Sequence, residues 1–127
     1  MAEVVLDASA ILALLRREKG FEKVEAVADS ASVSAVNLAE VVSYFTEAGQ
    51  PIAKVKTILQ ALRMRIVPFD EDQAVEVARL QPLTQHLGLS LADRACLGLA
   101  RLRREPAMTT DRAWRTLNLG IDVNVIR

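Results

Sequence analysis

Residues 4–15 read VVLDASAILALL, and they change character at Asp7. The run from Val4 to Leu6 has the β-branched and apolar side chains that favour a buried strand. Beyond Asp7, apolar side chains recur at helical spacing, starting with Ile11 and Leu12. The stretch therefore predicts a strand that passes directly into a helix, with a carboxylate at the junction.

The same alternation continues along the chain. Further strands are predicted at residues 31–35, 65–69, 107–109 and 123–126, and helices at residues 21–28, 37–48, 51–64, 70–80 and 90–104. Short apolar strands that alternate with helices are typical of a parallel sheet covered on both faces. The predicted class is α/β, a three-layer α/β/α sandwich around a parallel sheet of four to five short strands. In such sheets, ligands bind beyond the carboxyl ends of the strands.

Length and composition set further limits. A chain of 127 residues fits one domain, predicted to span residues 1–127. The mean hydropathy of +0.20 is high for so small a domain, so some apolar surface is expected to face a partner. Cys96 is the only cysteine, which excludes an internal disulfide and favours a reducing compartment. The apolar run near the N-terminus is too short to span a bilayer. We therefore expect a cytoplasmic protein that does not associate with membranes.

The formal net charge is zero, but the charges are unevenly distributed. Residues 1–93 carry nine basic and thirteen acidic side chains, whereas residues 94–127 carry seven and three. A basic C-terminal part could guide a phosphate backbone toward an acidic site. A solvated surface of mixed charge is the simpler interpretation.

Acidic residues follow the predicted elements at positions that share one edge of the sheet. Asp7 and Asp111 follow the first and fourth strands, while Glu40 and Asp93 fall in the first turns of two helices. Two carboxylates about 6 Å apart repel by roughly 3 kcal/mol at an effective dielectric of about 20. A raised pKa, an arginine partner such as Arg94 or a divalent cation could relieve this repulsion. Ligation by oxygen alone selects Mg²⁺ or Mn²⁺ over Zn²⁺.

Helix capping explains each acid equally well when it is taken alone. Asp7 and Asp111 are suited to cap the segments that follow them. The patterns that begin at Asn37 and Ser90 each place an acid three residues later, as a capping box does. Arg112 adjoins Asp111 and, like Arg94, is a candidate neutralising partner. The residues by themselves leave capping and metal binding as open alternatives.

Four segments together give the chain a family resemblance. They are residues 6–9 (LDAS), 37–41 (NLAEV), 88–97 (GLSLADRACL) and 109–114 (TTDRAW). In this order and at these separations, they resemble PIN-domain ribonucleases, specifically the VapC-type toxins of VapBC toxin–antitoxin systems. Thr110 stands where relatives often have alanine, a departure that should leave the chemistry unchanged.

The resemblance implies a metal-dependent endoribonuclease that cleaves structured RNA such as tRNA or rRNA. Asp7, Glu40, Asp93 and Asp111 would be its catalytic and metal-binding acids, with Mg²⁺ or Mn²⁺ as cofactor. Asp7 and Asp93 would bind the metal directly, Glu40 would act as ligand or base, and Asp111 would act through water. Ser9, Asn37 and Thr109 would support them. The resemblance also implies a homodimer and a VapB-type antitoxin partner held in an apolar groove, with candidates Ile11, Leu14, Val41, Val42 and Phe45.

The remaining polar residues suggest RNA contacts and two alternative functions. Arg94, Arg104, Arg112 and Arg115 are candidates for RNA phosphate contacts, although all could be surface arginines. His86 has no nucleophile motif beside it and is interpreted as a turn residue. A receiver-like Mg²⁺-binding signalling domain with Asp70 as phospho-acceptor is one alternative function. A PIN-like RNA- or protein-binding module without catalysis is another.

Overall fold

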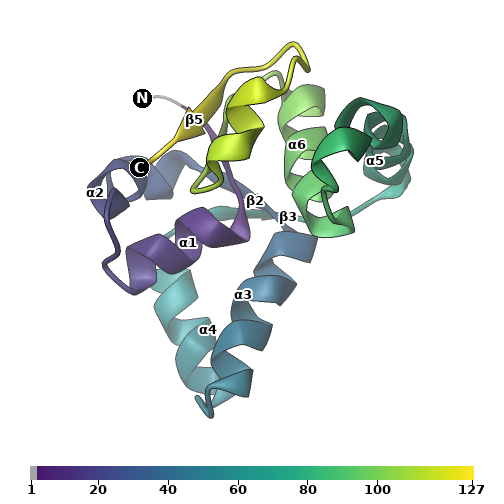
Figure 1. The fold of residues 1–127 in the computed structure, drawn as a ribbon. Helices are drawn as coiled ribbons and strands as arrows, with labels where there is room; N and C mark the ends of the chain where they lie inside the picture. The colour runs from purple at the N-terminus through teal and green to yellow at the C-terminus, as the bar shows by residue number, and fades with distance from the viewer. Residues whose placement is uncertain (1–2) are drawn as a thin grey trace.

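A parallel sheet forms the centre of the computed structural model, which describes residues 3–127 (Figure 1). Within these residues the strands are β1 (Val5–Leu6), β2 (Ser32–Ser34), β3 (Arg65–Val67), β4 (Ala107–Thr109) and β5 (Val123–Val125). They lie in the order β3-β2-β1-β4-β5, and every neighbouring pair is parallel. The predicted α/β class and its parallel sheet of short strands are therefore confirmed.

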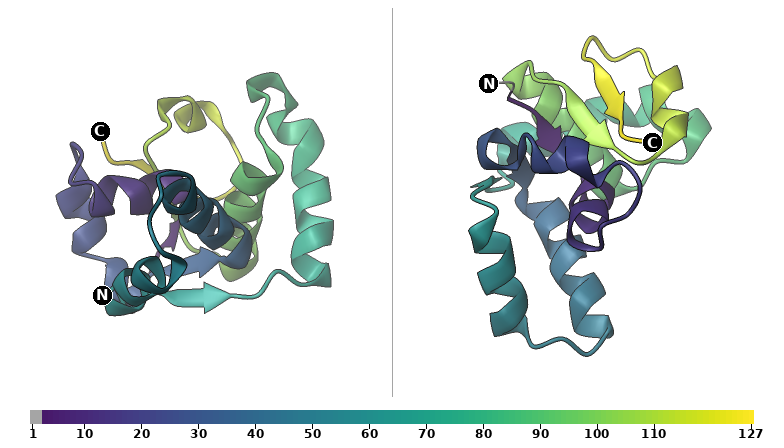
Figure 2. Two further views of the ribbon diagram at one scale, coloured as in Figure 1. Left: turned by 90° about the horizontal axis from the view of Figure 1, so that it is seen from below. Right: turned by 90° about the vertical axis from the view of Figure 1, so that its left-hand side faces the viewer.

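Helices cover both faces of the sheet (Figure 2). On one side lie α1 (Ala8–Leu15), α2 (Phe21–Glu25), η1 (Ala28–Ser30), α3 (Ala35–Glu47) and α4 (Ile52–Ala61). On the other lie α5 (Glu71–Thr84), η2 (Gln85–Leu87), α6 (Leu91–Arg103) and η3 (Arg112–Thr116). The lower parts of α3 and α4 extend side by side beyond the sheet (Figure 1). The result is the predicted three-layer sandwich.

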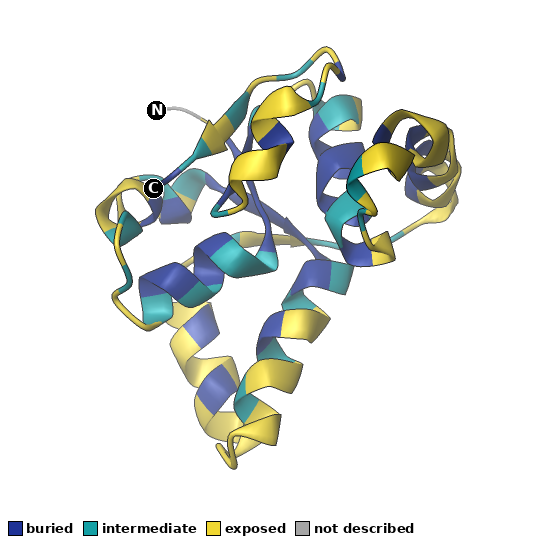
Figure 3. Ribbon diagram, in the orientation of Figure 1, coloured by how far each residue is buried: buried dark blue, intermediate teal, exposed yellow. Residues whose placement is uncertain are grey.

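The alternation of side chains along the central strand separates two cores. Leu6 packs with Ile11 and Val41 on the α1–α4 side, whereas Val5 packs with Leu97 and Trp114 on the α6 side. All six are 0% exposed. The buried colour in Figure 3 is concentrated in the central strands and the helix surfaces that face them. Because both faces of β1 are covered, residues at its carboxyl end are held in fixed positions.

Several element boundaries differ from those predicted. Ser34, rather than Asn37, caps α3, because its hydroxyl accepts from the N–H of Val36 at 3.2 Å. Pro51 is the N-cap of α4 rather than its first residue, and the helix ends at Ala61, short of residue 64. Helix α5 continues past residue 80 through Pro82. Pro82 cannot donate a hydrogen bond to the preceding turn, and the helix ends two residues later.

The strand order defines where ligands can bind. Successive strands β1, β2 and β3 run to one side, and the chain then crosses to place β4 on the other side of β1. The switch in direction therefore lies between β1 and β4. Asp7 directly follows β1 and Thr109 is the last residue of β4, so both lie at this point. Asp70 instead follows the outer strand β3 and caps α5 through the N–H of Gln73 at 3.0 Å. This order differs from the 2-1-3-4-5 order of receiver domains, which counts against the receiver alternative.

Residues outside the candidate site behave as packing residues. Cys96 is a buried free thiol, and Trp114 is fully buried. Tyr44 is 38% exposed and packs edge-on against Phe45. No helix among residues 3–127 combines the length and the apolar composition needed to cross a membrane.

Candidate functional site

Asp7 is a buried carboxylate at the carboxyl end of the central strand. It is the N-cap of α1, and its Oδ1 accepts a hydrogen bond from the N–H of Ala10 at 2.9 Å. Only 5% of the residue is exposed. The capping alternative is therefore correct for Asp7, but capping uses only one bond of a carboxylate that is almost wholly withdrawn from water.

Two hydroxyls hold both oxygens of this carboxylate. Ser9 donates to Oδ1 at 2.7 Å, and Thr109 donates to Oδ2 at 2.6 Å. The hydroxyl of Ser9 also accepts from the N–H of Thr110 at 3.0 Å, and that of Thr109 accepts from the N–H of Asp111 at 3.1 Å. The carboxyl ends of β1 and β4 are thus joined by one network that includes Asp7 and the backbone of Asp111.

Burial dominates the electrostatics of Asp7. It raises the pKa of the carboxyl from 3.8 to about 6, against the hydrogen bonds from Thr109, Ser9 and Ala10, which lower it. The negative charge of Asp93 adds to the rise. Ionised Asp7 is therefore electrostatically unfavourable unless positive charge approaches it.

Glu40 and Asp93 approach this region from two helices. Glu40 lies in the second turn of α3, one turn later than predicted, and is exposed. Asp93 lies in the first turn of α6, where it forms the predicted capping box with Ser90. The other predicted capping box, at Asn37 and Glu40, is wrong because Asn37 lies inside α3.

Cys96 shows how three of the acids are grouped. Burial raises the pKa of this thiol well above its usual value, and the charges of Asp7, Asp93 and Glu40 each raise it further. Asp7, which follows β1, therefore acts on the same buried thiol as the acids of α3 and α6. This grouping could not be derived from the sequence pattern, since it depends on how α6 crosses the sheet.

Two observations describe what surrounds these acids. No ion pair within 4.0 Å involves Asp7, Glu40, Asp93 or Asp111 in the part of the chain that the structure describes. Among the same residues, no three His, Cys, Asp or Glu side chains are arranged to hold an ion directly. Neither proposed arginine neutralises the acids: Arg94 donates to the carbonyl of Val77, and Arg112 to that of Arg127.

Asp111 and its neighbours form the outer part of the site. Asp111 is exposed and caps η3 by accepting from the N–H of Ala113 at 3.0 Å. Arg115 is exposed on the same short helix. Arg104 ends α6 at the opposite edge of the sheet, about 20 Å from the first turn of that helix at 1.5 Å per residue. Arg115 thus lies on the short helix that Asp111 caps, whereas Arg104 lies at the far end of α6.

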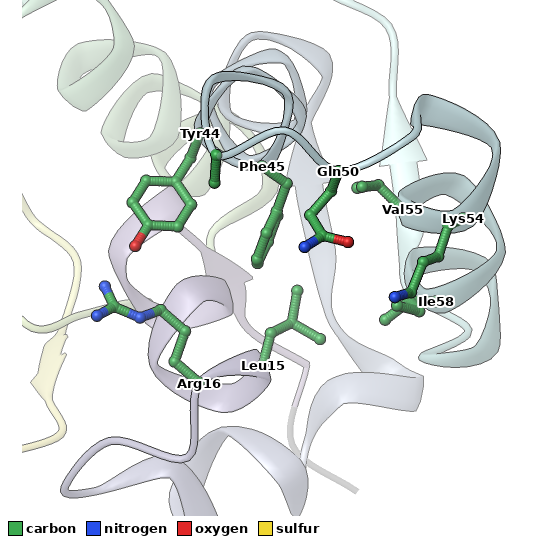
Figure 4. Close-up of a pocket in the computed structure, with 9 residues that line it drawn as sticks. Leu15, Arg16, Tyr44, Phe45, Gln50, Lys54, Val55 and Ile58 are labelled. Atoms are coloured by element: carbon green, nitrogen blue, oxygen red, sulfur yellow. The ribbon is translucent and has the colours of Figure 1, made fainter.

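The groove candidates separate into two groups. Ile11, Leu14 and Val41 are core residues, so simple packing explains them. Phe45 lines an apolar hollow of about 340 Å³ between α1, α3 and α4 (Figure 4). Val42 lines a second hollow of about 390 Å³ between α3, α4 and β3.

These features define an α/β protein with a carboxylate site at the switch point of its parallel sheet. A family model described as the PIN domain matches residues 4–118. The chain therefore belongs to the PIN domain family, as the sequence resemblance predicted. A search of curated proteins found no match.

Solved structures have the same fold. A toxin–antitoxin complex from Klebsiella pneumoniae matches with a TM-score of 0.74 and 19% identity, covering 93% of this chain and 94% of that chain. A DNA-bound VapBC from Salmonella typhimurium matches with a TM-score of 0.73 and 17% identity over 97% of both chains. VapBC-5 from Mycobacterium tuberculosis has a TM-score of 0.59 and 23% identity, over 100% of this chain and 99% of that chain.

Proposed function

We propose that this chain is a ribonuclease that uses Mg²⁺ or Mn²⁺ to hydrolyse phosphodiester bonds in structured RNA such as tRNA or rRNA, as the toxin of a toxin–antitoxin pair. The observation that carries this proposal is the buried Asp7 carboxylate, which lies at the switch point without an ion-pair partner among residues 3–127. Membership of the PIN domain family supports the nuclease assignment. Structural likeness to toxin–antitoxin complexes supports the biological role.

The chemical type of the donors suits a hard divalent cation that retains some of its waters, since no three of these side chains among residues 3–127 are arranged to hold an ion directly. Asp7, Asp93 and Glu40 supply carboxylate oxygens, and Asp111 lies at the outer side of the same network. Mg²⁺ and Mn²⁺ prefer such oxygens, and Mg²⁺ usually retains several waters, so the acids need not all touch it. A bound cation would supply polarisation of the phosphate and a water of lowered pKa.

The hydroxyls of Ser9 and Thr109 set the orientation of Asp7. An ionised carboxylate has about four lone-pair sites. Three are taken by Ser9, Ala10 and Thr109, all at 2.9 Å or less. We infer that these bonds prevent rotation of the carboxylate and leave one site for a cation or its water.

The exposed acids have complementary roles. Glu40 accepts a hydrogen bond from the Asn37 amide at 3.3 Å, and its exposure gives it access to solvent water. It is proposed as a metal ligand or as the base that takes a proton from the attacking water. Asp111 is proposed to act through water, because its Oδ1 already caps η3.

RNA would approach over η3. Arg115 is exposed there, close in sequence to Asp111, and Arg112 is also exposed although its Nε donates to the Arg127 carbonyl at 2.9 Å. Their positive charge would position a phosphate beside the acidic site. Arg94 is tied to α5 through the Val77 carbonyl and contributes to packing of the helices instead.

The hollow between α1, α3 and α4 is proposed to hold a helix of a VapB-type antitoxin (Figure 4). Apolar side chains line it, and Lys54 adds positive charge, as does Arg16, which is paired with Glu18 at 3.3 Å. An amphipathic helix with acidic flanking residues would match this surface. The residues concerned are Leu15, Arg16, Phe45, Lys54, Val55 and Ile58.

The second hollow, beside the exposed edge strand β3, is proposed as the homodimer face. Ile52 and Ile66 line it and are 58% and 41% exposed. Light scattering of the purified chain should then give twice its mass of 13.9 kDa. We also propose that residues 1–127 form one domain, since β5 lies beyond the matched residues 4–118 yet pairs with β4.

The function is tested by incubating the purified chain with bacterial tRNA and rRNA, with Mg²⁺, Mn²⁺ or EDTA. We expect discrete RNA fragments with either metal and none with EDTA. Asp7→Asn should abolish the fragments, because it removes the charge that holds the cation. If no metal yields cleavage of any RNA, the chain is a binding module without catalysis.

Asp70 provides a matched control. It is also an aspartate that follows a strand and caps a helix, but it lies beside the outer strand β3. Asp70→Asn should therefore leave RNA cleavage unchanged. Equal loss of cleavage in both variants would show that capping, rather than metal binding, explains the effect of Asp7.

A further inference from the structure

Asn37 makes a buried connection between the two helices that carry acids. Its side chain is 1% exposed, inside α3. Its Nδ2 donates to the carbonyl oxygen of Ala92 on α6 at 3.0 Å and to Oε1 of Glu40 at 3.3 Å. One amide group therefore contacts a candidate metal ligand and the backbone next to Asp93.

Burial of the Asn37 amide lowers the stability of the fold when it is considered by itself. The Oδ1 of Asn37 is buried and has no hydrogen-bond partner among the residues that the structure describes. An unsatisfied buried acceptor lowers stability, and an apolar residue of similar volume would avoid that loss. Turning the amide over would place the oxygen against two other acceptors, so the unpaired atom does not result from its orientation. Helix formation does not require Asn37 either, because Ser34 caps α3.

We propose that Asn37 is a positioning residue that fixes Glu40 and Asp93 relative to each other for metal binding. This inference rests on the proposed metal site. The bond to Ala92 holds the first turn of α6 against α3, and the bond to Glu40 directs that carboxylate toward the same region. Both bonds resist the repulsion between the two carboxylates, so Asn37 limits how far Glu40 and Asp93 can move apart before a cation binds. Partners of this kind typically change metal affinity by roughly 10- to 100-fold.

The test compares Asn37→Leu and Asn37→Ala with the unaltered chain. Mn²⁺ affinity is measured by calorimetry at pH 7.5, and melting temperature is measured in EDTA. We expect the Mn²⁺ dissociation constant to rise at least 10-fold in both variants. Asn37→Leu conserves the side-chain volume and should melt close to the unaltered chain, whereas Asn37→Ala leaves a cavity at this buried position and should melt at a lower temperature. A purely structural role would instead lower the melting temperature of both variants and leave the dissociation constant unchanged.

Thr84→Val is the matched control. Thr84 is also 1% exposed, but its hydroxyl donates only to the Leu80 carbonyl in its own helix α5. This variant should retain normal Mn²⁺ affinity. Glu40→Gln tests whether Asn37 acts through Glu40. If it does, the double variant Asn37→Leu/Glu40→Gln should raise the Mn²⁺ dissociation constant by less than the product of the two single fold-changes.

The outcomes separate the two proposals. If the unaltered chain binds no Mn²⁺, the proposed metal-dependent function fails. If it binds Mn²⁺ and the Asn37 variants bind it equally well, the function stands and the role of Asn37 is wrong. Independent effects of Asn37 and Glu40 would also contradict the positioning role.

Discussion

The hydroxyl of Thr109 donates to Oδ2 of Asp7 across 2.6 Å, although the two residues are 102 positions apart. Thr109 ends β4 and Asp7 follows β1, and these strands are adjacent and parallel. Thr109→Val should therefore lower the free energy of unfolding at pH 7 by about 1–3 kcal/mol, because the buried carboxylate loses a donor. Urea denaturation measures this loss. Thr109→Ser keeps the hydroxyl and should retain most of the stability, and equal losses would contradict the proposed role of the bond.

Stability without metal should fall as the pH rises from about 4 to about 6. The folded pKa of Asp7 is about 6, against 3.8 for its ordinary value, so the folded state binds more protons between these limits. At about 1.36 kcal/mol per unit, the shift corresponds to a loss of about 3 kcal/mol. Asp7→Asn should remove this part of the pH dependence. Urea unfolding in EDTA at successive pH values tests it, and an unchanged pH profile in the variant would contradict the assignment.

Gly20 and Gly49 provide a comparison for the C-terminal segment. Both have positive φ, +92° and +84°. A Cβ on Gly20 would lie 2.3 Å from the backbone oxygen of Ile126, whereas one on Gly49 would meet nothing within 4 Å. Gly49→Ala should cost about 1–2 kcal/mol from backbone strain alone. Gly20→Ala should lower the stability measured by thermal unfolding clearly more than Gly49→Ala does. Equal losses in the two variants would mean that the C-terminal segment moves away freely.

Arg115→Ala should weaken RNA binding and reduce the salt dependence of binding by about one unit of slope. The reason is the exposed position of Arg115 on η3, beside Asp111. Fluorescence anisotropy with labelled tRNA in Ca²⁺ measures binding over a salt series. Arg104→Ala, at the opposite edge, should change neither quantity. A larger effect at Arg104 than at Arg115 would place the RNA on the other side of the molecule.

The sequence predicted the sheet because its apolar runs are short and alternate with helices. It also predicted that Asp7 and Asp111 share an edge, since parallel strands end together. It did not predict the strand order, which depends on contacts between distant segments. The spacing of Asn37 to Glu40 predicts a capping box, but Ser34 caps the helix instead, which frees Asn37 to contact α6. Only the family resemblance favours metal binding by these acids, because the local sequence pattern fits helix capping equally well.

The most direct test of the account is the effect of Mn²⁺ on unfolding at pH 7.5. The unaltered chain should gain stability as Mn²⁺ increases, by about 2.7 kcal/mol at one hundred times the dissociation constant. Asp7→Asn should start from a higher melting temperature in EDTA, because no buried charge remains, and should gain nothing from Mn²⁺. If Mn²⁺ stabilises both chains equally, or stabilises neither, the claim that the buried Asp7 carboxylate binds a divalent cation is contradicted.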